Sequence, residues 1–161
     1  MSRKKVIYTL GTSNRSLDEF LRLLRAQGIE QVIDVRRFPV SHRFPHFSRQ
    51  VLEDSLRRKG IRYRFLGREL GGYRSGGYEA YRATEAYRTA LERLQTLAAE
   101  RPSVIICAER FPWRCHRRHL AEDLSRLGWR VIHILDEKRL WEPSGGDIPG
   151  DNEKGPGRCS P

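Results

Sequence analysis

The residues best suited to chemistry in this sequence lie around Cys115, in residues 114–118 (RCHRR). The apolar pattern predicts that a helix begins at Cys115, and a thiol at a helix N-terminus among arginines is shifted toward the reactive thiolate. His116 is able to transfer a proton, and Asp34 and Glu109 supply carboxylates for acid/base work. This constellation suits an enzyme with a nucleophilic cysteine. The alternative is structural: Cys115 packs at a helix start and the arginines are solvated.

The same region holds four possible zinc ligands, which are Cys107, Cys115, His116 and His119. Structural zinc sites usually draw on closely paired cysteines, and the sequence has no Cys-x-x-Cys pair. An adjacent Cys and His at a helix start should also point in different directions. We therefore predict no metal ion, and a zinc-supported structural domain stays open as an alternative.

An anion site is a third possibility at this helix start. Free backbone N–H groups there would bind a phosphate or carboxylate, with help from Arg36, Arg114 and Arg117. Ser13 and Asn14 add a hydroxyl and an amide in the turn Gly-Thr-Ser-Asn. The turn lacks the lysine of a P-loop and the G-x-G-x-x-G spacing of a dinucleotide site. We therefore expect neither NTPase nor NAD chemistry, and no cofactor.

These residues need a scaffold, and the apolar pattern predicts alternating strands and helices. Strands are expected over residues 6–10, 32–35, 61–66, 104–108 and 131–135. Helices are expected over residues 16–28, 48–60, 78–100 and 115–127. Such alternation indicates a single α/β domain with a mostly parallel five-stranded sheet and helices on both faces, a Rossmann-like three-layer fold.

Ligands bind such folds beyond the carboxyl ends of the strands, where the strand order reverses. A strand order of 3-2-1-4-5 would place this point between the first and fourth strands. One cleft would then collect the polar residues that follow the strands, namely Ser13, Asn14, Asp34, Arg36, Cys107, Glu109, Cys115, His116 and Arg117.

Asp34 gives the sharpest test of this arrangement. It lies in an apolar run, where a lone carboxylate is costly to bury, so it needs a partner. Arg36 should share its face of the strand, because side chains alternate along a strand. We expect Asp34 to be buried and hydrogen-bonded to the helix start at 115–118 or to the turn at 11–14. A bond to Arg36 alone would indicate an isolated structural bridge.

Charge favours a phosphate-bearing partner. The chain has 161 residues and a formal net charge of +11. Between Arg36 and Arg74, eleven Lys and Arg residues stand against three Asp and Glu residues. Basic balance of this kind suggests nucleic acid or nucleotides. An arginine excess that comes from genome composition is the competing explanation.

The loop after the second predicted strand interleaves cations with rings, in the order Arg37, Phe38, His42, Arg43, Phe44, His46 and Phe47. Aromatic rings among cations suit base stacking and phosphate contact. The competing interpretation, which we favour from the sequence, is that the phenylalanines fill the core beneath a long loop.

The remaining sequence features concern domain organisation and compartment. One domain is predicted over residues 4–142, followed by a flexible Gly- and Pro-rich tail over 143–161. No apolar run approaches the roughly 18 residues of a membrane span, and no signal peptide follows the basic N-terminus. Three cysteines make no disulfide framework. These features predict a cytoplasmic protein with no membrane partner, and they leave the oligomeric state open.

Five motifs occur in an order typical of one family, namely residues 8–14 (YTLGTSN), Asp34-Val35-Arg36 with Pro39 and Ser41, Leu70-Gly71-Gly72, Cys107-Ala108-Glu109 and Cys115-His116-Arg117. Over about residues 6–135 the chain resembles the bacterial and archaeal family catalogued as domain of unknown function 488. Members often have His where Thr12 stands. The resemblance implies an intracellular α/β domain and points to the same residues at the strand ends. It implies no reaction.

Overall fold

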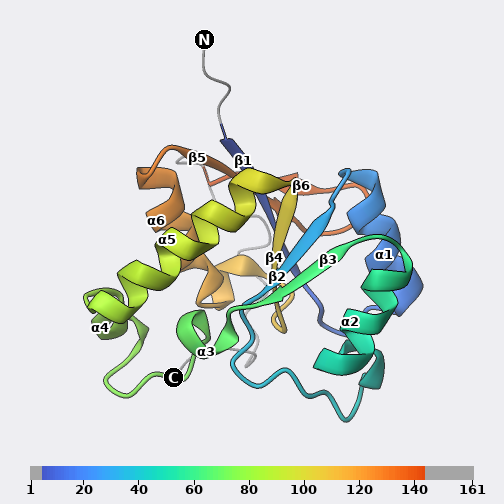
Figure 1. The fold of residues 1–161 in the computed structure, drawn as a ribbon, viewed down its shortest axis with the longest axis horizontal. Coiled ribbons are helices and arrows are strands. Elements are labelled where there is room, and N and C mark those ends of the chain that lie inside the picture. Colours follow the sequence, from blue (N-terminus) through green and yellow to red (C-terminus); the bar gives the residue numbers. More distant parts are fainter. Residues whose placement is uncertain (1–4, 144–161) are drawn as a thin grey trace.

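The computed structural model describes residues 5–143, and its centre is a six-stranded sheet (Figure 1). The strands are β1 (Lys5–Gly11), β2 (Gln31–Asp34), β3 (Arg62–Phe65), β4 (Ser103–Cys107), β5 (Trp129–Ile134) and β6 (Leu140–Trp141). Only β6 runs antiparallel to its neighbour, β5. The predicted α/β fold is confirmed. The sixth strand escaped prediction because two residues show no alternation. Except for Pro143, the predicted tail over 143–161 lies outside the described residues, and so Cys159 does too.

Helices cover both faces of the sheet, as predicted (Figure 1). On one face, α1 (Leu17–Ala26) and α2 (Arg49–Arg58) pack their leucines and Phe20 against Leu10, Val32 and Val104 of the strands. The core of the other face takes side chains from α3 (Gly67–Leu70), α4 (Tyr78–Arg82), α5 (Glu85–Glu100) and α6 (Arg117–Arg126). Two 3-10 turns, η1 (Pro45–Phe47) and η2 (Pro112–Arg114), complete the described elements. None of the described helices is long and apolar enough to span a membrane.

Two of the predicted helices have different bounds. The helix expected over 78–100 is divided into α4 and α5, because the Thr84 hydroxyl caps the second piece by accepting the Tyr87 N–H at 3.2 Å. The helix expected to begin at Cys115 begins at Arg117 instead. Cys115 has extended backbone angles and ends η2, so it lies just before the helix and not in its first turn.

The strand order is β3-β2-β4-β1-β5-β6, so the predicted order 3-2-1-4-5 was wrong. β1 and β4 are neighbours in the sheet. The chain leaves β1 for β2, which lies on the far side of β4, and it leaves β4 for β5, which lies on the far side of β1. The connection after β1 therefore crosses the connection after β4. Gly11 lies at this crossing, because a Cβ there would come within 2.0 Å of the Glu109 carbonyl oxygen.

The crossing connections remain hydrogen-bonded beyond the strands. Thr12 N–H donates to the Cys107 carbonyl at 2.8 Å, and Ser13 N–H donates to the Ala108 carbonyl at 2.9 Å. The crevice that sequence reasoning placed between the first and fourth strands is therefore filled by backbone. One open cleft at this end of the sheet lies to the side, toward the long loop after β2.

Candidate functional site

Asp34 is fully buried at the end of β2, as predicted, but it is bonded to Arg36 and Tyr63 and not to the helix start or the turn that we expected. Arg36 donates to both carboxylate oxygens, from Nε to Oδ1 at 2.9 Å and from Nη2 to Oδ2 at 2.8 Å. The Arg36 backbone N–H donates to Oδ1 at 3.0 Å, and the Tyr63 hydroxyl of β3 donates to Oδ2 at 2.5 Å. The expected bonds to the 115–118 segment or the 11–14 turn are replaced by this set, because β3 brings Tyr63 alongside β2.

These contacts fix the charge state of the cluster. Burial lowers the pKa of Arg36, but the hydrogen bond and charge of Asp34 outweigh it and raise that pKa overall. Burial and the neighbouring Asp34 carboxylate raise the pKa of Tyr63. Arg36 therefore stays a cation and Tyr63 stays a hydroxyl donor. A carboxylate whose oxygens accept four hydrogen bonds is poorly placed to act as a general base.

Cys115 and His116 lie at the same end of the sheet but on its other face. Cys115 belongs to the core under α5 and α6, whereas Tyr63, the partner of Asp34, belongs to the core under α1 and α2. The Cys115 sulfur lies 2.8 Å from the Cys107 sulfur and 3.5 Å from His116 Nδ1. The predicted single constellation is therefore divided by the sheet into an acid–arginine cluster and a thiol–histidine cluster.

Arg117 is fully buried and lies where the crossing connections meet. Its guanidinium donates to the Thr9 hydroxyl at 3.0 Å and to the Glu109 carbonyl at 2.7 Å. The Thr9 hydroxyl is 2.5 Å from His133 Nδ1, and burial lowers the pKa of His133 to about 3, with the charge of Arg117 adding to the effect. Arg117 thus holds the connection after β4 against β1. This role is structural, whereas the sequence led us to expect phosphate binding.

The remaining predicted residues are partly exposed. Burial raises the pKa of the Glu109 carboxyl. The Arg114 guanidinium lies 5.4 Å from the centre of the Phe111 ring. Asn14 accepts a hydrogen bond from Arg110 at 2.9 Å, and this bond again ties the two crossing connections together.

The zinc alternative has no support in the described part of the chain. No group of three or more His, Cys, Asp and Glu side chains there has the geometry to hold a metal ion. His119 is directed away from the two thiols: its Nδ1 lies 3.1 Å from Arg82 and 3.1 Å from Glu79. Its ring is stacked on Tyr78 at 5.5 Å.

An open cleft of about 620 Å³ lies beside the ends of β1, β2 and β4. Residues 12–14 and Ala108 form one wall, and residues of the 36–47 loop form the other. We call this space the loop cleft. Ser13, Asn14 and Arg36 are the predicted ligand-binding residues that line it. The side chains of Glu109, Arg114, Cys115, His116 and Arg117 are not among its lining residues.

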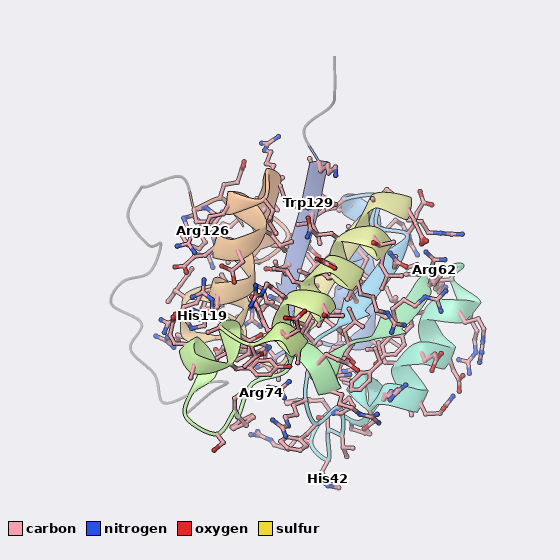
Figure 2. The ribbon with its side chains drawn as sticks, turned by 60° about the vertical axis from the view of Figure 1, so that its left-hand side comes forward. His42, Arg62, Arg74, His119, Arg126 and Trp129 are labelled. Atoms are coloured by element: carbon pink, nitrogen blue, oxygen red, sulfur yellow. The ribbon has the colours of Figure 1, made fainter. Side chains whose placement is uncertain are left out.

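Several hydrogen bonds hold the 36–47 loop in place. Arg36 Nη1 donates to the Phe47 carbonyl at 2.6 Å, and a His46 ring nitrogen bonds the Arg15 carbonyl at 2.8 Å. The Ser48 hydroxyl accepts the Ser41 N–H at 3.0 Å and donates to the Ser41 carbonyl at 3.3 Å. The Ser41 hydroxyl accepts the Phe44 N–H at 3.0 Å. Its position in space is plain in Figure 2, where His42 lies at the tip of the molecule opposite Trp129.

The loop uses its phenylalanines in two ways: Phe47 fills the core, as the interpretation favoured from the sequence has it, whereas Phe38 is exposed. Phe47 is buried against Phe20 of α1, with ring centres 5.2 Å apart. Phe38 is 67% exposed and lies 5.9 Å from the ring of Tyr73, which is 52% exposed. Of the residues of this loop, only Arg36 was predicted as a site residue. Alternation of cations and rings was the signal, but it does not tell an exposed ring from a buried one.

The comparisons with known proteins add a family. The family model described as "Domain of unknown function DUF488" matches residues 16–124. The chain belongs to this family. No curated protein and no solved structure matches the chain.

The geometry explains two motifs of this DUF488 domain. Gly11 has no side chain because the crossing connection passes over it, as described above. In Leu70-Gly71-Gly72, a Cβ on Gly71 would lie 2.5 Å from the Cβ of Arg37. Arg37 in turn donates to the Tyr73 carbonyl at 3.0 Å. The glycine motif therefore allows the segment after α3 to pack against the start of the 36–47 loop.

Proposed function

We propose that this DUF488 domain binds a phosphate-bearing ligand in the loop cleft, and that the ligand is nucleic acid with unpaired bases. The observation that carries the proposal is Phe38, a large ring 67% exposed at the rim of a cleft. The hydrogen bonds of the 36–47 loop hold its backbone in a conformation that leaves this ring in solvent. Rings held in this way are stacking platforms for bases, worth about 1–3 kcal/mol per base.

Two rings of the loop each have an arginine beside them. The Arg37 guanidinium lies 5.7 Å from the Phe38 ring centre, and the Arg43 guanidinium lies 5.5 Å from that of Phe44. Among the residues that the structure describes, none that lines the loop cleft carries a carboxylate. We expect a base to stack on the exposed Phe38 ring while a neighbouring arginine contacts phosphate. The formal net charge of +11 adds long-range attraction for the same class of ligand.

Binding without chemistry fits the cleft better than catalysis does. Asp34 is engaged by Arg36 and Tyr63, so it has no free role as a base. Cys115 and His116 lie on the other face of the sheet and do not line the cleft. The alternative ligand is a single nucleotide, which would use the same arginines. A site for a single nucleotide would not bind a longer chain more tightly.

The experiment is a titration of labelled oligonucleotides followed by fluorescence anisotropy. A single-stranded oligonucleotide, its duplex and a mononucleotide are compared at two salt concentrations. We expect the single strand to bind most tightly, with affinity falling steeply as salt rises. If a mononucleotide binds tightly and a longer chain binds no better, the ligand is a small nucleotide and not nucleic acid. The absence of any binding at low salt would refute the proposal.

Two variants with matched controls locate the site. Phe38→Ala should weaken single-strand binding by about 5- to 100-fold through lost stacking. Leu127→Ala removes a side chain of similar exposure, 52%, at the far end of α6 and should leave binding unchanged. Arg43→Ala should lower the salt dependence by about one counterion. Arg126→Ala is its control, since Figure 2 shows Arg126 far from the loop at His42.

A further inference from the structure

The thiol–histidine cluster has a chemistry that the loop cleft does not use. Two cysteines from different elements meet beneath α6: Cys107 ends β4, and Cys115 ends η2. Their sulfurs are 2.8 Å apart, closer than an ordinary non-bonded contact and less than about 1 Å longer than a disulfide bond. The two residues are only 1% and 3% exposed. A small movement of either side chain would therefore join them.

The hydrogen bonds around the pair distinguish the two sulfurs. His116 Nε2 lies 3.3 Å from the Val35 carbonyl, which only accepts, so Nε2 carries the proton. His116 Nδ1 is then an acceptor, and it faces the Cys115 sulfur at 3.5 Å. Burial lowers the pKa of His116, which keeps the ring neutral and able to accept. The Cys107 thiol instead donates to the Glu109 carbonyl at 3.6 Å, which retains its proton.

We propose that Cys107 and Cys115 form a reversible disulfide, with Cys115 as the attacking thiol, Cys107 as the resolving thiol and a small hydroperoxide as the oxidant. Because both sulfurs are buried, we expect only a small oxidant such as hydrogen peroxide to reach them. The inference does not depend on nucleic-acid binding, because neither thiol lines the loop cleft.

The reaction balances in two steps. His116 Nδ1 takes the Cys115 thiol proton, and the thiolate attacks one peroxide oxygen while the O–O bond breaks. The leaving hydroxide takes the proton from His116 as water, and Cys115 becomes a sulfenic acid. The Cys107 sulfur then attacks the Cys115 sulfur, and the S–O bond breaks. The Cys107 proton and the hydroxyl leave as a second water. Two thiols are oxidised, one peroxide is reduced, and an external dithiol restores the thiols.

The first test is peptide mapping of the full chain carrying Cys159→Ser, which removes the third thiol. After hydrogen peroxide, we expect one linked peptide pair that contains Cys107 and Cys115 and has lost two hydrogens. Dithiothreitol should restore both thiols. If both thiols stay reduced at a peroxide dose that oxidises Cys159 in the wild-type chain, the proposal fails. Oxidation to sulfinic acid without a link would also overturn it.

Variants then test the roles. Cys107→Ser should accumulate sulfenic acid on Cys115, which a dimedone-type probe would label. Label on the other cysteine in the Cys115→Ser protein, at an equal rate, would overturn the assignment of the attacking thiol. His116→Asn should slow disulfide formation by at least about tenfold, because the proton acceptor is lost. His119→Asn is the matched control, since His119 contacts Arg82 and not the thiols, and its rate should stay at the wild-type value.

Discussion

The two clusters at the carboxyl end of the sheet solve the problem of burial in different ways. The acid–arginine cluster buries opposite charges, and it balances them with paired hydrogen bonds from Arg36 and Tyr63 to Asp34. The thiol–histidine cluster buries groups that are neutral, Cys107, Cys115 and His116, in an apolar core. A buried charge that loses its partner costs far more free energy than a buried neutral group that does so.

The difference teaches why the two clusters have different uses. The charges of the acid–arginine cluster are paired with each other, so this cluster stabilises the structure around it. Arg36 also donates to the Phe47 carbonyl and thereby holds the 36–47 loop. The second cluster keeps its bonding capacity, because a thiol pair and a neutral imidazole are still able to exchange protons and electrons. Rigidity on one face and reactivity on the other follow from this contrast.

The largest expected effect comes from breaking the charge pair. Asp34→Asn leaves the Arg36 cation buried without its counter-charge, and should lower the free energy of unfolding by about 3–5 kcal/mol. Urea denaturation measures it. The control is Glu137→Gln, which removes a pair with Arg22 whose side chains are 59% and 57% exposed, and should cost under about 1 kcal/mol. Equal losses for the two variants would contradict the anchoring role of Asp34.

The two uses of phenylalanine in the 36–47 loop give the next effect. Phe47→Ala removes a buried ring and should cost about 3–5 kcal/mol of stability. Phe38→Ala removes an exposed ring and should change stability by less than about 0.5 kcal/mol. Thermal or urea unfolding of the two variants gives the comparison. A large loss for Phe38→Ala would mean that this ring stabilises the fold and is not held out for a ligand.

The crossing of the two connections is tested by Gly11→Ala. The added Cβ would overlap the Glu109 carbonyl oxygen, 2.0 Å away, and the backbone would have to move. We expect a loss of about 1–3 kcal/mol or a failure to fold. Gly60→Ala is a useful comparison, because it introduces only backbone strain at a φ of +75°, with nothing within 4 Å of the new atom. A Gly11 variant as stable as the wild type would show that the crossing has room to spare.

Acidification should affect the face that carries the buried histidines. The pKa of His133 is about 3 in the folded state and about 6.5 in the unfolded state, so below pH 6.5 the unfolded state binds more protons. Stability should therefore fall as the pH decreases from 6.5 toward 3, by about 1.4 kcal/mol per pH unit for this residue. Urea unfolding at several pH values measures the slope.

His116 adds to the same trend, because burial lowers its pKa too. The variant His133→Gln removes one titrating group and should flatten the slope below pH 6.5. An unchanged slope in this variant would mean that His133 is accessible to protons in the folded state, contrary to its 1% exposure.

The sequence by itself determined the fold class and the end of the sheet where polar residues gather. Apolar runs of strand length that alternate with helical periods require layered α/β packing, whatever the strand order. It also determined that Asp34 would be buried with Arg36 on its face, because side chains alternate along a strand. Local rules of this kind depend only on residues that are near one another in the chain.

Tertiary structure alone decided which polar residues meet. The place of β4 between β2 and β1 is a long-range pairing that no local pattern encodes, and it closed the predicted crevice. The partner Tyr63 comes from β3, 29 residues away from Asp34, so its hydrogen bond depends on strand pairing. The exposure of Phe38 and the burial of Phe47 likewise depend on where the loop is anchored. Phe47, nine positions after Phe38, is buried because Phe20 of α1 packs against it. The residues next to each ring in the sequence do not indicate which of the two will be buried.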